Sequence, residues 1–565
     1  MNLKRYTIAL LALLAGVSAW AQNMDPTVTV TRQYQGKLIE VGKPDLTMTV
    51  PDSLTRFDLK IDYSVFDNPY KGAYEFNPYL MEIRPQSEAF YGNEFFLRAG
   101  AGYALYPTLD LAWTPKTKKT FKMSIFASHD SYFGDYRTIT AQKQATTAQG
   151  SNPYILTYKK GDAKWKGYDM LSRAGVNIRS DWKKGIFAAT AMYYGIHTRD
   201  NILANNDSLQ RGYNAADVNL RLTSKKEHRT QFFYDVAMGY RFAAETPTGA
   251  FYHNLALDLT MGKNFNSKSA FYVDLRGDSE ISDTAFSSVS TVSLVPKYVY
   301  NYGRWNIEAG LNLSLPYQTI DNKFGQIAYP AIDLNFEMVK KYLNVYLEAK
   351  GGTEVASYAS MLQGNHHFSS LYSFANSSIT GISMERVGAK FGFEGNFAQR
   401  FFYDLSAGYN NYLSLPVYTV YGLTGTQSVM TPGIVYSAAA GLRADAKMGW
   451  KSERVDVEAY FAFSNLKVEA PAFAPSQFKA GVDAKYNWNK RIYAGVFCDY
   501  ASASKYSDFA ILPYYVDLGL MGEYKLNRKF SLWLEAGNLL NMTIQRTPLY
   551  AESGINFTVG VCLNF

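Results

Sequence analysis

A two-residue alternation of apolar and polar side chains constrains the fold of this chain more than any other feature. At the C-terminus, Phe565, Leu563 and Val561 are apolar, and the residues between them are polar or small. The alternation recurs from about residue 94 onward, with full charges on the polar side, as in "RWNIEAGLNLSL" and "ERVDVEAYFAFS". A period of two indicates strands with one apolar and one wet face. The apolar face contacts either a protein core or lipid.

Strand length and the pattern of connections favour lipid. The alternating segments run for about 10 to 14 residues, whereas globular strands have about 5 or 6 and a tilted strand crosses a bilayer with about 9 to 11. Ten connections are short and polar, at residues 115–120, 182–185, 225–228, 263–268, 301–304, 339–341, 396–400, 450–453, 487–491 and 526–529. Usually longer ones lie between them, the largest near residues 131–167 and 353–383. This pattern is typical of a transmembrane β-barrel with tight periplasmic turns and longer outer loops.

The turn count predicts the strand count. With both chain ends in the periplasm, ten turns imply about 22 antiparallel strands, the first near residues 94–104 and the last at 554–565. The weakly marked segments 105–108 and 413–430 leave this count open by about two strands. Because hydrocarbon leaves no partner for an exposed backbone group, the sheet must close, with the last strand bonded to the first. The alternation predicts that Val457 faces lipid at mid-strand and that Glu458 faces the lumen.

The N-terminus predicts a secretory signal peptide over residues 1–21. Lys4 and Arg5 precede the apolar run "TIALLALLAGV" and the small-x-small site that ends at Ala21. No later segment reaches the roughly 18 to 20 apolar residues of a membrane-spanning helix. We therefore predict an all-β chain with a short periplasmic or lumenal segment at residues 22–92 and one barrel at residues 93–565. The 45 Tyr and 35 Phe suit a barrel with aromatic girdles.

Two motifs near the C-terminus carry a family resemblance. The segments "SLWLEAGNLLN" and "INFTVGVCLNF" resemble the end of the C-terminal barrel of TonB-dependent receptors. Terminal Phe565, with Leu563 and Val561, is also similar to the signal that the barrel-insertion machinery recognises. The resemblance implies an integral protein of a Gram-negative outer membrane, in contact with its lipid, that mediates or assists solute uptake.

The N-terminal segment departs from that family. TonB-dependent receptors carry a large plug in the lumen, and residues 22–92 are too few for a complete one. The segment "PTVTVTR" is similar to a TonB box, which pairs with TonB by strand addition. Its candidate residues are Pro26, Thr27, Val28, Thr29 and Val30. The alternative is an ordinary extended segment without a TonB partner.

The polar faces of the strands predict a charged lumen. The candidate lining residues are Arg98, Arg173, Arg221, Asp258, Arg276, Glu308, Asp333, Glu348, Arg454, Asp456 and Glu458. They form either a selectivity lining or, as we favour for any single residue, a solvated wall with internal salt bridges. Both signs occur, so the sequence predicts no strong preference for anions or cations.

Transport is the leading hypothesis for function, with the loops near 131–167 and 353–383 folded inward as a lid, because an open barrel this wide leaks. The alternative is a non-transporting scaffold or assembly subunit whose lumen is closed by the N-terminal segment or by a periplasmic or surface partner. We expect no enzyme, cofactor or metal. His129 and Asp130 are the nearest approach to a catalytic pair, and adjacent His366 and His367 have poor chelate spacing.

Composition and cysteine placement exclude two further properties. The formal net charge is +8, but Lys and Arg are spread over turns without a dense basic stretch, so we expect no nucleic-acid partner. Cys498 and Cys562 fall on opposite strand faces about three strands apart, which is roughly 14 Å at the usual strand spacing. A disulfide tolerates at most about 7 Å between Cα atoms, so we predict two free thiols.

Overall fold

A computed structural model describes residues 94–565, except residues 104, 118–119, 146–153, 201–208, 226–231, 283–287, 320–325, 369–379, 399, 424–428 and 507–509. The predicted signal peptide, the segment 22–92 and the TonB-box-like residues Pro26 to Val30 lie outside the described residues. Their assignments therefore stay predictions.

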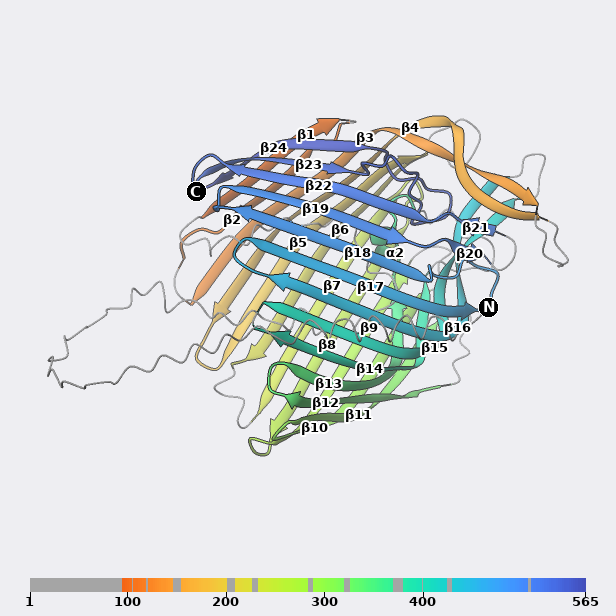
Figure 1. Cartoon of the computed structure of the whole chain (residues 1–565). Helices are drawn as coiled ribbons and strands as arrows, with labels where there is room; N and C mark the ends of the chain where they lie inside the picture. Colours follow the sequence, from red (N-terminus) through yellow and green to blue (C-terminus); the bar gives the residue numbers. More distant parts are fainter. Residues whose placement is uncertain are drawn as a thin grey trace, which may run out of the picture. The chain divides into compact units, whose positions relative to one another are not determined.

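The described residues form one sheet of mostly long and almost entirely antiparallel strands, and one short helix, α2 (Tyr358–Gly364) (Figure 1). The strands are β1 (Phe95–Tyr103), β2 (Thr108–Trp113), β3 (Phe121–Ala145), β4 (Tyr154–Asp181), β5 (Gly185–Asp200), β6 (Leu209–Ser224), β7 (Phe233–Thr246), β8 (Phe251–Asn264), β9 (Ser269–Ser282), β10 (Val289–Tyr302), β11 (Trp305–Gln318), β12 (Ala328–Val339), β13 (Leu343–Ala356), β14 (Gly381–Phe397), β15 (Phe401–Leu423), β16 (Val429–Lys451), β17 (Val455–Val468), β18 (Phe478–Trp488), β19 (Ile492–Ala501), β20 (Ser504–Tyr506), β21 (Ala510–Leu512), β22 (Tyr515–Lys525), β23 (Phe530–Gly537) and β24 (Asn556–Asn564). As far as residues 94–565 are described, they contain no helix with the length and apolar character to cross a membrane.

The sheet closes into a barrel of 22 strands. Each strand pairs with its neighbour in sequence, except that β19 pairs with β22 and the short β20 and β21 form a hairpin. Strand β21 of this hairpin also pairs in parallel with β4. The predicted count is therefore confirmed, and all ten predicted short turns fall between strands that the structure pairs or places in succession. The weakly marked segment at 413–430 lies in the long strands β15 and β16 and the connection between them.

The predicted closure between first and last strands is also confirmed. Strand β1 pairs with β24 from Phe96 opposite Asn564 to Tyr103 opposite Phe557. Beyond this ladder, the backbone N–H of Phe565 donates to the carbonyl of Phe95 at 2.9 Å, and Phe95 donates back at 3.0 Å. The C-terminal residue thus completes the hydrogen-bond ladder that removes the sheet edge.

A tryptophan on β23 packs flat across this closing seam. A Cβ atom added at Gly100 would lie 2.4 Å from the Trp533 ring. A Cβ atom added at Gly560 would lie 2.5 Å from the same ring and 2.1 Å from the Ala99 carbonyl oxygen. Arg98 covers the ring with its guanidinium 3.8 Å from a ring centroid. The absence of side chains at these two glycines is therefore what lets the indole lie against β24 and β1.

The predicted facing of the strands is confirmed by exposure. On β11, Leu315 is 63% exposed while the adjacent Ser314 is fully buried, and Leu311 and Leu313 lie on the exposed face. A soluble sheet buries its apolar face, so an apolar face exposed around a closed barrel indicates lipid contact. Exposed tryptophans mark the strand ends at the short turns: Trp113, Trp182, Trp305, Trp450 and Trp488.

The largest buried cluster lies inside the barrel. Helix α2 contributes Tyr358, Met361 and Leu362, and Phe368 follows it; the wall contributes residues of β4 to β8 and Ile434 of β16. The connection at 353–383 therefore folds inward where it is described, as predicted. The connection at 131–167 is a paired hairpin where it is described, because β3 continues to Ala145 and β4 begins at Tyr154. This hairpin also reaches elements on other parts of the barrel: β4 pairs with β21 at Leu156, and Tyr158 packs on Phe473.

Candidate functional site

A segment that we call the lumenal strap, Ser357–Phe368, is tied to the inner wall at its helical end. The Ser357 hydroxyl caps α2 by accepting the backbone N–H of Ser360 at 3.2 Å. The Tyr358 hydroxyl donates to Glu245 of β7 at 2.7 Å, and its backbone N–H donates to Glu280 of β9 at 3.0 Å. Tyr358 is only 1% exposed, so both carboxylates meet it in a dry environment.

The other end of the strap reaches a different part of the barrel. Nδ1 of His366 lies 2.8 Å from Asp169 of β4, and the carbonyl of His367 accepts the Tyr550 hydroxyl at 2.9 Å. Burial alone would lower the pKa of His366, but the Asp169 carboxylate raises it above its usual value. Burial lowers the pKa of the neighbouring His367 to about 4. The strap is thus held by the ion pair of His366 with Asp169 at one end and by the hydrogen bonds of Tyr358 to two carboxylates at the other. The Tyr550 hydroxyl adds a hydrogen bond to the carbonyl of His367.

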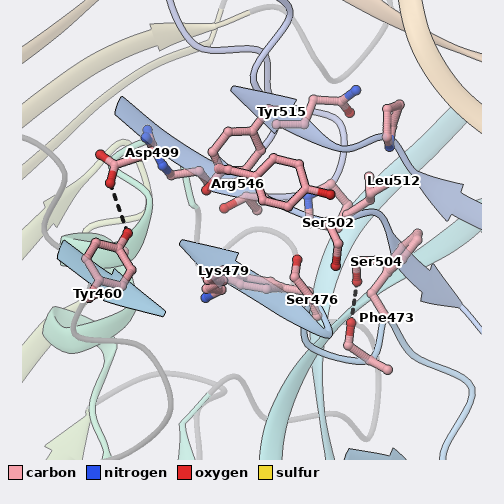
Figure 2. A pocket seen from close by; sticks show the side chains of 18 residues that line it. Tyr460, Phe473, Ser476, Lys479, Asp499, Ser502, Ser504, Leu512, Tyr515 and Arg546 are labelled. Atoms are coloured by element: carbon pink, nitrogen blue, oxygen red, sulfur yellow. Dashed lines mark hydrogen bonds between the residues drawn. The ribbon is translucent and has the colours of Figure 1, made fainter. Parts of the chain in front are cut away.

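A polar pocket lies beside the end of the strap (Figure 2). It has a volume of about 90 Å³, and Gly364 at the end of α2 contributes to its lining. The other lining residues come from β15, β17, β18, β19, β20, β21 and β22 and from the connections between β17 and β18, between β19 and β22, and between β23 and β24: Tyr418, Tyr460, Phe473, Ala474, Ser476, Lys479, Asp499, Tyr500, Ser502, Ser504, Leu512, Pro513, Tyr515, Gln545, Arg546, Thr547 and Pro548. The pocket therefore lies where the wall, three connections and the strap meet.

An arginine centre organises the charges of this pocket. Arg546 donates to Asp517 at 3.2 Å and also to Glu552, and its guanidinium lies 5.2 Å from the Tyr515 ring. Burial raises the pKa of Glu552, although Arg546 opposes this shift. Two carboxylates therefore share one guanidinium, so this centre contributes no net positive charge.

The remaining polar groups of the pocket include an acidic, a basic and an amide side chain. Figure 2 shows Asp499 pointing toward Tyr460, whose hydroxyl donates to it at 2.9 Å, and Lys479 on the neighbouring strand. Gln545 is 5% exposed; its Nε2 donates to the Tyr158 carbonyl at 3.0 Å, while its Oε1 has no hydrogen-bond partner among the described residues. The pocket thus offers an ammonium donor, a carboxylate acceptor and a buried amide acceptor.

Most of the predicted lining residues are in ion pairs with neighbours on the same face of the wall. Arg98 lies 3.4 Å from Glu535, Arg221 lies 2.6 Å from Asp235, Asp258 lies 3.9 Å from Arg276, Glu308 lies 3.8 Å from Lys297, Asp333 and Glu348 lie 3.4 Å and 3.7 Å from Lys350, and Glu458 lies 2.6 Å from Lys447. Arg173 instead lies over the Tyr194 ring at 5.5 Å. Exposed pairs of this kind contribute less than about 1 kcal/mol each. Asp456 is on β17 with Glu458, whereas Arg454 is exposed in the turn before that strand.

The His129 and Asp130 pair is not brought together as a site. Asp130 pairs with Leu171, which packs in the cluster around α2, so the neighbouring His129 points to the opposite face of the wall. The ring nitrogens of His129 lie 2.8 Å from the Ser172 hydroxyl and 3.1 Å from that of Ser131. Because adjacent strand residues face opposite sides, Asp130 cannot orient this imidazole.

His366 and His367 diverge rather than chelate. The sequence shows no acidic neighbour for His366, but the fold brings Asp169 to it from β4. Within the described residues there is no group of three or more His, Cys, Asp or Glu side chains placed to hold a metal ion. Cys498 and Cys562 are both free, as predicted.

Comparison with known proteins defines the class of fold. The chain forms a closed 22-strand barrel, and solved structures of low sequence identity share this fold. Its structure is similar to the copper transporter OprC, with a TM-score of 0.59 and 12% identity over 84% of this chain and 80% of that one. It is also similar to a variant of the ferric enterobactin receptor PfeA of Pseudomonas aeruginosa (TM-score 0.58, 9% identity, 84% and 82% covered). The FrpB iron transporter of Neisseria meningitidis gives a TM-score of 0.57 with 9% identity, over 83% and 81%.

Comparison by sequence identifies no relative of the chain. No family model matches the chain, and no curated protein matches it. The three solved structures named above are described as two transporters and a receptor.

Proposed function

We propose that this chain is an integral outer-membrane barrel that takes up a solute, recognised in the polar pocket and admitted when the lumenal strap moves. The observation that carries this proposal is the strap itself: a buried helix tied by side-chain hydrogen bonds across the interior of a lipid-facing barrel. The similar solved structures include a copper transporter and an iron transporter, which supports a transport role on the same type of barrel.

The candidate lining residues belong to this proposal as the walls of the path. Their internal ion pairs keep both signs of charge in place, which supports a hydrated interior without a strong ion preference. The layout of signal peptide (1–21), N-terminal segment (22–92) and barrel (93–565) is part of the same proposal, as is insertion through the C-terminal residues Phe565, Leu563 and Val561. TonB is proposed as the partner of residues Pro26 to Val30.

A planar-bilayer experiment tests the proposal. The full chain is compared with a variant in which residues 358–367 are replaced by a Gly-Ser linker, and with one that lacks residues 22–92. We expect small currents from the full chain and steady, larger single-channel currents when the strap is replaced, either alone or together with the deletion. Silence in the strap variant and in the double variant, with the barrel folded in each, would support a scaffold and overturn the uptake proposal.

A matched control keeps the result specific. Replacing the Tyr358 hydroxyl alone, by Tyr358→Phe, removes the bond to Glu245 and leaves the strap length unchanged. Brief openings are expected in this variant, because the ring still fills its site while one anchor is lost. Heat-dependent mobility on a gel shows for each variant whether the barrel has formed.

A further inference from the structure

The side chains that line the polar pocket limit the chemical class of ligand that it can bind. We propose that it binds a neutral, polyhydroxylated ring, that is, a carbohydrate or the sugar part of a larger molecule. This inference rests on the proposed uptake function, because it names the class of solute. It is argued from the charges, the ring faces and the hydrogen-bonding groups of the pocket.

A free anion does not fit the charges. The guanidinium of Arg546 already faces Asp517 at 3.2 Å and Glu552, so a phosphate or carboxylate would compete with two carboxylates. The carboxylate of Asp499 lines the same pocket and repels a further negative charge. A metal ion is disfavoured as well, because Lys479 lines the pocket and the described residues hold no metal-binding cluster.

A purely apolar ligand does not fit the polar groups. Covering Asp499 and Lys479 with hydrocarbon would remove water from two charged groups without replacing its hydrogen bonds, which is unfavourable. Gln545 Oε1 is a buried acceptor with no partner among the described residues, so it calls for a donor. A ligand of this pocket must therefore donate and accept at several points.

Hydroxyl groups meet this requirement because each donates and accepts at once. A ring hydroxyl can accept from Lys479 while donating to Gln545 or Asp499. At a water's share of liquid volume, about 30 Å³, the 90 Å³ of the pocket holds about three waters. The hydroxyls along one edge of a sugar ring can replace these waters with equivalent hydrogen bonds.

The aromatic side chains of the pocket also suit a sugar ring. Tyr515, Tyr460 and Phe473 line the pocket (Figure 2), and the C–H face of a pyranose packs on such rings. Two of these rings are held in place: Arg546 lies over Tyr515 at 5.2 Å, and the Tyr460 hydroxyl is fixed by Asp499 at 2.9 Å. Rings held before binding lose little freedom when a ligand stacks on them.

The test is binding of the purified full chain, in detergent, to an array of mono- and oligosaccharides, followed by titration of the bound sugars. Gln545→Leu removes the buried acceptor, and Tyr515→Ala removes a ring face. We expect each to weaken binding at least tenfold, whereas Lys447→Ala on β16, outside the pocket, leaves it unchanged. Inorganic phosphate is expected neither to compete nor to shift the melting temperature.

Three results would overturn the sugar proposal: no saccharide bound by the folded chain, sugar binding unchanged in Gln545→Leu and Tyr515→Ala alike, or phosphate bound in the pocket instead. Should Tyr515→Ala fail to fold, Gln545→Leu decides alone. These results are separate from the bilayer currents of the strap variant. Currents without saccharide binding leave the uptake proposal standing and remove the ligand class only.

Discussion

The facing of the wall makes a quantitative prediction on β17, where Phe461 is 43% exposed on the lipid side. Phe461 lies six positions after Val455, the first residue of the strand. At about 3.3 Å per residue and a tilt of about 40°, it sits roughly 15 Å above the short-turn end of an apolar band about 25 Å tall. Phe461→Arg therefore places a charge near the midplane and is expected to cost about 2 to 4 kcal/mol.

Val457 lies at a shallower depth than the alternation alone indicates. The residue is the third of β17 and pairs with Trp450, an exposed aromatic at the strand end, so it is at girdle level and not at mid-strand. Its depth is roughly 5 Å by the same geometry. Val457→Arg is accordingly expected to cost about 1 kcal/mol or less.

The assay is equilibrium urea unfolding from lipid vesicles, read by tryptophan fluorescence and gel mobility. Glu458→Arg is the inward control: it exchanges an ion pair with Lys447 for a repulsion in a hydrated lumen, at a cost of less than about 1 kcal/mol. The expected order of destabilisation is Phe461→Arg well above Val457→Arg and Glu458→Arg. Equal losses for Phe461→Arg and Glu458→Arg would show that the assigned faces are wrong.

Three further predictions follow from the seam, the strap and the thiols. Gly560→Ala is expected to lower the stability to urea and the heat resistance of the folded band on a gel, because the added Cβ would lie 2.1 Å from the Ala99 carbonyl oxygen. Gly522→Ala is a neutral control, because its added Cβ would lie 3.9 Å from the nearest atom. The raised pKa of His366 means that its pairing with Asp169 is fully present below the ordinary value of 6.5 and is lost as the pH rises through the higher folded value. Single-channel openings are therefore expected to increase as the pH rises above 6.5, and a wild-type response retained in His366→Gln would contradict this reasoning. Alkylation of the unreduced, unfolded chain is expected to add two adducts, at Cys498 and Cys562, whereas a mass without adducts would indicate a bridge.

The wall was predictable because one physical constraint acts on every strand. Each backbone group in hydrocarbon needs a partner, and each strand must show an apolar side to lipid, so the periodicity and the turns determine strand count, facing and closure. The sequence did not indicate the hairpin structure beyond the membrane, where that constraint ends. Beyond the membrane, β3 and β4 continue as a paired hairpin to Ala145 and from Tyr154, where no lipid imposes a pattern.

The site was less accessible to sequence reasoning for the same reason. Asp169 and His366 are far apart in the chain, and nothing in either neighbourhood marks them as partners. Gln545 and Arg546 lie in the non-strand connection between β23 and β24, which has no periodicity. The residues of the polar wall were identifiable as charged, but their ion pairs depend on register between neighbouring strands, which the sequence gives only through turn positions.

The strap differs from the wall in how its position is determined. Its apolar residues, such as Met361 and Leu362, fit many inner surfaces, whereas its bonds from Tyr358 to Glu245 and from His366 to Asp169 select one arrangement. Hydrogen bonds to charged groups contribute about 1.5 to 3 kcal/mol each, while ordering a residue costs about 1 to 2 kcal/mol in backbone entropy. The backbone entropy of ordering the strap therefore opposes the anchors and the apolar contacts that hold it. We therefore expect the strap to open far below the free energy of unfolding the barrel, which a gate requires and a permanent wall element does not.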